Sequence, residues 1–333
     1  KTEIYLPQVL HVEAGTVRAL DYEQDILFAL DWSGIDPAPL VAKIPENFTS
    51  AERQMRRIHL VDSGKERIVA DVTDATGERL AFDPAYAVRM VSDLVPNAWI
   101  ARALVGGLVD GLKRRGFADE VLGKLHGLLI EELRKWLTAE RDRMAETLFR
   151  QEVTAGRIQF RLRADRHNWH MPKDSVTYEP KGADQLPGAD GEPLHRSLFA
   201  PIYKNDLNEQ EREVAVYLDA EKSLVWWHRN VARHQYVVQG WRRERIYPDF
   251  VFAVRPGNQY HKGNRLVVME TKGDQLQGNR DTEYKRAVLQ LMTETFQIDQ
   301  TQRVGELSMV NPDGTTVECD LVLMSEWKTK LPE

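Results

Sequence analysis

The chain has 333 residues, a formal net charge of −6 and 42% hydrophobic residues, which is typical of a globular protein with room for two domains. Its single cysteine, Cys319, excludes a disulfide within the chain and a cysteine-based zinc cluster. No apolar segment of the sequence is long enough to span a bilayer, so we expect a cytoplasmic protein without a membrane partner.

Residues 1–160 are predicted to form an α+β module that becomes largely helical from about residue 83. The first part of the module alternates strand-like runs, such as Arg57–Val61, with loops. Leu20–Leu30 is expected to form a short helix capped by Asp21. No pattern in this part indicates catalysis, so we interpret the module as a spacer or docking surface.

Start and stop signals divide the helical part of this module. Asp83 precedes Pro84, which predicts a helix cap followed by proline in the first turn. Another helix is expected to begin near Asn97, and a break falls at Gly116. Beyond the break, apolar residues recur at helical spacing, which predicts one or two long amphipathic helices that end near Gly156. We expect a packed helical bundle here.

Residues 161–195 are predicted to be a linker or extended loop. Met171–Pro193 is rich in proline, glycine, aspartate and lysine and has no apolar period. A basic run at its start is either a contact for a DNA backbone or a solvated face. That run comprises Arg161, Arg163, Arg166 and His167. Two nearby histidines, His167 and His170, are too few to specify a metal site.

Residues 196–333 are predicted to form an α/β domain. The expected elements are a helix over Leu207–Ala220, strands over Ser223–Asn230, Ile246–Val254 and Arg265–Lys272, a helix from Asp281 to about Gln297, and a final hairpin joining Leu307–Val310 to Val317–Met324. Proline and glycine between the second and third strands predict that these two strands form a hairpin. His228 is interpreted as a core residue of the first strand or as a residue that supports the side chains of the site.

Three charged residues on the two hairpin strands carry the main functional signal. Glu270 and Lys272 lie two apart at the end of an apolar strand, so their side chains point to the same face. Asp249 lies near the start of the preceding strand, and the hairpin is expected to bring it close to Glu270. Two neighbouring carboxylates need a compensating cation, and oxygen ligands suit Mg²⁺, for which Mn²⁺ can substitute.

Asp249, Glu270 and Lys272 are therefore predicted to be the catalytic residues of a metal-dependent phosphodiesterase. A divalent ion polarises a phosphoryl oxygen and lowers the pKa of an attacking water. Lys272 would orient that water or stabilise charge in the transition state. The expected metal ligands are Asp249, Glu270 and the backbone carbonyl of Thr271, with Glu211 on the core-facing side of the preceding helix as an additional candidate. The alternative is a surface ion pair between Glu270 and Lys272, with Asp249 in an unrelated turn.

Basic residues flank the hairpin although the whole chain is acidic. Because phosphate contacts need Lys and Arg, these residues are predicted to bind DNA. They are Arg242, Arg243 and Arg245 before the first motif strand, and Lys262 and Arg265 in the connector. The negative net charge nevertheless predicts weak DNA affinity for this chain alone.

The order helix, three strands, helix, strand resembles the PD-(D/E)xK, or restriction-endonuclease-like, nuclease core. Over about Leu194–Gln297, the segments EREVAVYLD, LVWWHRN, GWRRERIYPDF, VVMETKG and GNRDTEYKR resemble the C-terminal endonuclease region of the Res subunits of type III restriction enzymes and their DEAD/DEAH-helicase relatives. The resemblance implies a mixed central sheet and a Mg²⁺-dependent endonuclease that acts on double-stranded DNA. By motif matching, Asp249, Glu270 and Lys272 take the catalytic positions, and Glu211 matches the helix glutamate.

The same resemblance implies partners. In this family the nuclease is coupled to an ATP-driven helicase or translocase motor and, in restriction systems, to a methyltransferase subunit. The chain contains no G-x-x-x-x-G-K-[ST] phosphate loop. The resemblance therefore implies that the motor lies upstream in a longer chain, and the start at Lys1 rather than at methionine indicates an excised fragment. The alternative is a naturally separate nuclease.

Two other functions remain open from the sequence. The domain could be a module that holds nucleic acid or a protein on a nuclease fold without cutting, although an intact set of three charged residues argues against it. It could also be a structure-specific or single-strand nuclease of DNA repair.

Overall fold

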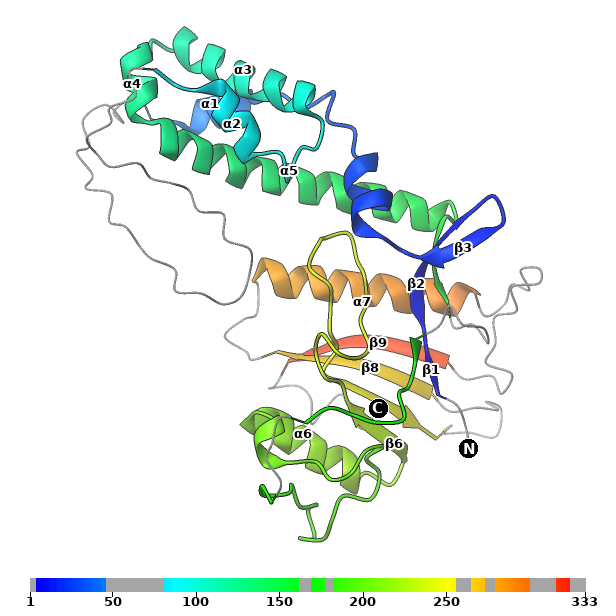
Figure 1. The fold of residues 1–333 in the computed structure, drawn as a ribbon. Helices are drawn as coiled ribbons and strands as arrows, with labels where there is room; N and C mark the ends of the chain where they lie inside the picture. Colours follow the sequence, from blue (N-terminus) through cyan, green and yellow to red (C-terminus); the bar gives the residue numbers. More distant parts are fainter. Residues whose placement is uncertain are drawn as a thin grey trace. The chain divides into compact units, whose positions relative to one another are not determined.

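The computed structural model describes residues 4–45, 81–161, 169–177, 182–255, 265–272, 279–299 and 316–323. The chain divides into two compact units, one formed by Lys1–Asp25 with Leu148–Glu333 and the other by Ile26–Thr147. Figure 1 shows the helices and strands of both units. In the described part of the chain, no helix is both long enough and apolar enough to cross a membrane.

The unit Ile26–Thr147 is helical. Its elements are η2 (Leu27–Ala29), α1 (Ala38–Lys43), α2 (Pro84–Met90), α3 (Ala98–Arg114), α4 (Asp119–Lys124) and α5 (His126–Thr154), the last of which extends past the unit's final residue. The predicted helix starts are confirmed: the Asp83 side chain accepts hydrogen bonds from two amides of α2, and the Asn97 side chain does the same for α3. The predicted break at Gly116 is also confirmed: it lies between the end of α3 and the start of α4, and its φ of 90° favours glycine. Arg57–Val61 lies outside the described residues.

The helices of this unit share one apolar core. Every buried member of the cluster lies between Trp32 and Leu137, and the largest contributions come from α3 and α5. Two arginines connect the helices to neighbouring segments of the unit. Arg115, after α3, donates to the carbonyl oxygens of Val41 and Ile44 at the end of α1, and Arg134 of α5 pairs with Asp93, after α2, at 2.7 Å. The packed bundle predicted from the apolar spacing is therefore present in the described residues.

The other unit contains a three-stranded sheet built from its two separate chain segments, with two strands from residues 1–25 and one from the beginning of residues 148–333. Its strands are β2 (Gln8–Glu13), β3 (Thr16–Ala19) and β4 (Ile158–Arg161), and a two-stranded sheet pairs β1 (Tyr5–Leu6) with β5 (Trp169–His170). β2 is the middle strand and pairs antiparallel with both neighbours. Tyr236 binds the start of the chain to the second segment of this unit, since its hydroxyl donates to the carbonyl of Pro7, between β1 and β2, at 2.7 Å.

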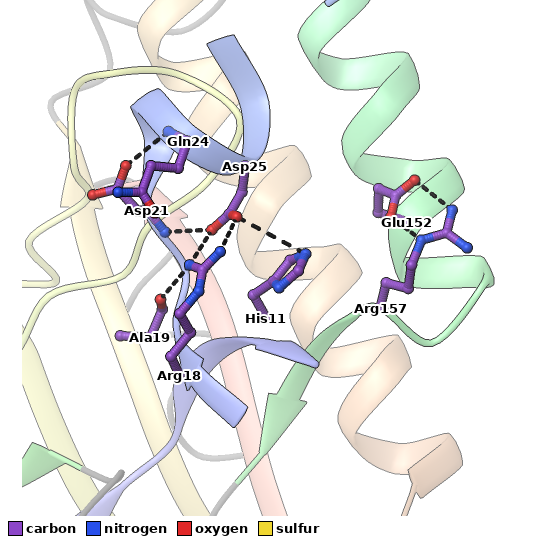
Figure 2. Close-up of polar contacts among 8 residues, drawn as sticks. All are labelled: His11, Arg18, Ala19, Asp21, Gln24, Asp25, Glu152 and Arg157. Carbon is purple, nitrogen blue, oxygen red and sulfur yellow. Dashed lines mark hydrogen bonds and ion pairs between the residues drawn. The ribbon is translucent and has the colours of Figure 1, made fainter. Parts of the chain in front are cut away.

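A cluster of charged side chains fixes the segment after β3. The Asp25 carboxylate lies between Arg18 and His11 (Figure 2), accepting from Arg18 Nη1 at 2.7 Å and approaching His11 Nε2 at 3.9 Å. Burial alone would raise the pKa of Asp25, but the bonds from Arg18 and from the Asp21 amide lower it below its usual value. The short helix predicted over Leu20–Leu30 is present as two consecutive helical segments, the π-helix η1 (Tyr22–Ile26) and the 3-10 helix η2.

The predicted cap of that helix is confirmed. Asp21 Oδ1 accepts from the Gln24 amide at 2.8 Å. Farther along the same unit, Arg157 and Glu152 pair at the end of α5 (Figure 2).

The same unit contains a four-stranded mixed sheet of order β6-β7-β8-β9. In chain order, the strands of this sheet and the helices around it are η4 (Lys204–Asp206), α6 (Glu209–Ala220), β6 (Leu224–Arg229), β7 (Phe250–Val254), β8 (Arg265–Lys272), α7 (Arg280–Asp299) and β9 (Thr316–Leu323). β7 pairs antiparallel with both β6 and β8, so the predicted hairpin is present. β9 runs parallel to β8. The predicted partner of β9, Leu307–Val310, lies outside the described residues.

The two helices of this domain lie on opposite sides of the mixed sheet (Figure 1). α6 packs into a core with the alternate residues Phe250 and Phe252 of β7 and Val267 and Met269 of β8. α7 contacts β9 and the β4 strand of the other sheet. α7 begins one residue before Asp281, the expected cap, because the Asn279 side chain accepts from the Asp281 amide at 3.1 Å.

Candidate active site

Asp249 lies beside the strand that carries Glu270 and Lys272. Its Oδ2 accepts hydrogen bonds from the amide of Thr271 at 2.7 Å and from the Thr271 hydroxyl at 2.6 Å. Its own amide donates to the carbonyl of Met269 at 2.9 Å. These bonds exist because the antiparallel β7–β8 ladder ends here, which puts the start of β7 against the end of β8. The hairpin thus brings the Asp249 carboxylate to Thr271, the residue between Glu270 and Lys272.

Glu270 has a different partner. Its side chain is 3% exposed, and its Oε1 lies 2.6 Å from Nζ of Lys285 in α7. Lys285 Nζ also lies 3.7 Å from Asp281, one turn earlier on the same helix. Sequence reasoning missed Lys285, although a signal was present: it precedes the apolar residues Val288, Leu289 and Met292 at the spacing of a buried helix face.

The alternation of β8 separates the two carboxylates. Met269 points into the core with α6, so Thr271, two residues on, points the same way, and Glu270 points to the opposite face. The Asp249 carboxylate contacts the Thr271 side chain and is therefore on the α6 side of the strand. Among the described residues, no three His, Cys, Asp or Glu side chains form a group arranged to hold a metal ion.

Glu211 lies at the start of α6 and caps it. Its amide bonds to the Asn208 side chain at 2.9 Å, and its Oε2 accepts from the Asn208 amide at 2.8 Å, which is a capping box. Burial raises the pKa of the Glu211 carboxyl above its usual value; the bond from Asn208 and the Arg229 guanidinium at 3.7 Å oppose this, and the negative charge of Asp249 adds to it. The negative charges of Glu211 and Asp249 are therefore close enough to repel each other.

The donor set fits Mg²⁺ in its chemistry. On the α6 side of β8, Asp249 and Glu211 supply carboxylate oxygens and Thr271 supplies a backbone carbonyl, all of which are ligands that hard divalent cations prefer, whereas Glu270 lies on the opposite face with Lys285. Mg²⁺ commonly keeps several waters and takes only one or two carboxylates, together with substrate phosphates. A group of three protein ligands is thus not required. The side chain of Lys272 lies outside the described residues, so its position is not part of this geometry.

The predicted DNA-binding arginines differ in their surroundings. Arg242 stacks on the ring of Tyr284, 4.6 Å from its centroid, and donates to the Arg280 carbonyl at 3.3 Å. Arg243 is exposed and pairs with Glu23 at 3.2 Å, while Arg245 is exposed. Lys262 and the side chain of Arg265 lie outside the described residues. Arg243 and Arg245 are therefore accessible on the segment that precedes β7.

Comparisons of the chain with protein-family models, with curated proteins and with solved structures give no match.

Proposed function

We propose that this chain is a Mg²⁺-dependent endonuclease that hydrolyses phosphodiester bonds of double-stranded DNA, as the nuclease part of an ATP-dependent, type III-like restriction or phage-defence system in the cytoplasm. The observation that supports it is the position of the Asp249 carboxylate, held by the amide and hydroxyl of Thr271 between Glu270 and Lys272. Its proposed partners are DNA, a helicase or translocase motor, and a methyltransferase subunit.

Each residue has a distinct role in the proposed reaction. A bound divalent ion would polarise the phosphoryl oxygen and acidify a water. Asp249 and Glu211 would be its carboxylate ligands on the α6 side of β8, with the Thr271 carbonyl as a further oxygen donor. Glu270 lies on the opposite face and would join them only by leaving its ion pair with Lys285. The two hydrogen bonds from Thr271 fix the orientation of Asp249 in advance. The water oxygen would bond to phosphorus as the bond to the leaving 3′ oxygen breaks, with the water's proton passing to solvent and the 3′ oxygen taking one from solvent, and Lys272 would stabilise the developing charge.

Plasmid cleavage tests this function. Supercoiled DNA incubated with Mg²⁺ or Mn²⁺ and high protein concentration should be nicked or linearised, and Asp249→Ala should reduce the rate by about 100-fold or more, as Lys272→Ala should. Asp249→Ala should keep the fold, because it also relieves repulsion with Glu211. Asp174→Ala changes an exposed aspartate of the same unit and serves as the matched control. Normal cleavage by Asp249→Ala would contradict the assignment.

A second candidate is a nuclease fold that binds without cutting. It is supported by the ion pair between Glu270 and Lys285, which neutralises a carboxylate that a metal would otherwise need. Under this alternative the wild-type protein binds DNA or a protein partner, shows no cleavage, and gives no metal-binding heat that Asp249→Ala removes. A single-stranded substrate in the same assay separates a repair nuclease from a restriction nuclease by its preferred strand form.

A further inference from the structure

Two buried amide side chains hold the loop Val231–Gln235, which follows β6, in a fixed shape. Asn230, just before the loop, donates from its Nδ2 to the Tyr236 carbonyl at 2.8 Å and accepts from the Tyr236 amide at 2.9 Å. Gln235, at the end of the loop, accepts from the Val231 amide at 2.8 Å. Because these bonds are satisfied inside the protein, the exposed residues of the loop keep a defined position.

The exposed part of this loop contains an unusual backbone conformation. Arg233 has a φ of 68°, in the left-handed region that residues other than glycine seldom adopt. Ala14, which shares this feature in the described part of the chain, lies in the turn between β2 and β3, where a tight hairpin requires it. Arg233 is in no such turn. Strained residues of this kind persist only where their surroundings enforce them, and they are common at binding sites.

The Arg233 guanidinium is exposed and makes no hydrogen bond or ion pair with any residue that the structure describes. The loop that carries it begins next to the candidate active site. The amide of Asn230 donates to the Asp249 carbonyl at 2.8 Å, and Asn230 Nδ2 also donates to the Pro248 carbonyl at 2.8 Å. A free cation is therefore presented by a rigid loop whose base is bonded to Asp249.

The connection from β6 to β7 is basic although the whole chain is acidic. Residues 231–247 contain four arginines and one glutamate, a formal charge of +3, whereas the chain has a net charge of −6. Arg233 lies near the start of this connection, and the accessible Arg243 and Arg245 lie near its end. DNA phosphates are attracted by such a charge, and a guanidinium can donate two parallel hydrogen bonds to one phosphate.

We propose that Arg233 binds a phosphate of the DNA backbone, which the loop Val231–Gln235 positions beside the candidate active site. This contact rests on the DNA-binding part of the proposed function and does not depend on which residues hold a metal ion. Because the loop is already ordered, DNA binding does not need to fix its backbone. A phosphate contact positions the duplex without reading its sequence, so Arg233 should matter equally for unrelated sequences.

Fluorescence anisotropy with a labelled DNA duplex, in EDTA and over a series of salt concentrations, tests the contact. Each phosphate contact adds about 0.9 to the steepness with which the logarithm of the association constant falls with the logarithm of salt concentration. Arg233→Asn should remove about that amount and weaken binding about tenfold, since it removes the charged donor. Asparagine tolerates a positive φ, so the thermal midpoint should stay the same or rise. Arg233→Lys should restore most of the salt dependence.

Arg255→Asn is the matched control. Arg255 is an exposed arginine just past the opposite end of β7, and its replacement should leave the salt dependence unchanged. The contact is refuted if Arg233→Asn keeps the salt dependence of the wild type, if Arg255→Asn lowers it equally, or if the wild type binds no duplex.

Plasmid cleavage with Mg²⁺, measured in parallel, separates this contact from the nuclease function. Cleavage by the wild type together with an unchanged salt dependence in Arg233→Asn refutes the contact and leaves the nuclease proposal standing. A lower salt dependence in Arg233→Asn, with no cleavage by the wild type, supports the contact and contradicts the nuclease proposal.

Discussion

His228 shows how one buried side chain links stability to pH. It is 2% exposed in β6, and its Nε2 lies 2.8 Å from Oε1 of Gln235, which also accepts from the Val231 amide. An oxygen that accepts both bonds requires Nε2 to carry the proton. Burial lowers the pKa of His228 to about 4, and the charge of Arg229 contributes in the same direction.

The direction of the pH effect follows from this pKa. Between the folded pKa of about 4 and the ordinary histidine pKa of 6.5, the unfolded chain binds a proton that the folded chain does not. The stabilising effect is therefore complete above pH 6.5 and is lost as the pH falls toward 4, by about 3 kcal/mol in total. Urea unfolding at pH 7.5 and 4.5 measures it. His228→Gln should flatten this dependence, whereas His195→Gln, at an exposed histidine, should not.

At the same scale, the sequence predicted the location of the charged residues better than their contacts. The strand pattern predicted that Asp249 would reach the end of β8, and it does. The hydrogen bonds from Thr271 depend on how the ladder ends, which periodicity does not encode. The partner of Glu270 was missed because Lys285 is fifteen residues away along the chain and on another element.

Among the elements, the segment before β7 is held by close packing against α7. A Cβ added at Gly240 would lie 2.5 Å from the Tyr284 hydroxyl and 2.7 Å from a methyl carbon of Val288. Trp241, the next residue, meets the Tyr284 ring edge-on at 5.1 Å between centroids. Glycine is therefore required where the arginine-bearing segment crosses the helix.

Gly240→Ala should lower the free energy of unfolding by about 1–3 kcal/mol, the usual cost of inserting a methyl group into a packed site. Gly106→Ala is the matched control, since no atom lies within 4 Å of the added Cβ in α3. In a helix interior that change should raise stability by about 0.5–1 kcal/mol. Chemical denaturation of both variants gives the comparison, and equal effects would contradict the packing argument.

The helices of this protein were the most predictable elements. Asp83 and Asn97 start α2 and α3 because a side-chain oxygen next to an apolar repeat is a local signal. The direction of β9 was not predictable in this way. Its parallel pairing with β8 depends on a connection that includes all of α7, and the residues of the strand fit either direction.

At the scale of the whole molecule, one compact unit uses two distant parts of the chain. β2 and β3 come from the first twenty-five residues, and β2 is the middle strand of a sheet whose two edge strands are β3 and β4. The sequence predicted domain boundaries at residues 160 and 195, which remain predictions. Local patterns cannot show that the beginning of a chain pairs with residues about 150 positions later, because such pairing depends on loop closure and burial.

Fragments test this division. Residues 26–147 contain a complete apolar core and should unfold in one cooperative thermal transition on their own. Residues 148–333 alone lack the middle strand and should unfold without a sharp transition, and adding a peptide of residues 1–25 should restore it. A fragment 148–333 as stable as the intact unit would show that β2 is dispensable.

The two neighbours of β8 have a consequence for the rate at which its amides exchange with solvent. Because β7 and β9 run in opposite directions beside it, opening β8 requires two different ladders to break together. The amides of Leu266–Met269, where both ladders are present, should therefore be among the slowest of the sheet to take up deuterium. Glu270–Lys272 lie beyond the ladder with β7 and pair only with β9, so the end of β8 that carries the candidate site should exchange faster than the middle of the strand, apart from the Thr271 amide that donates to Asp249.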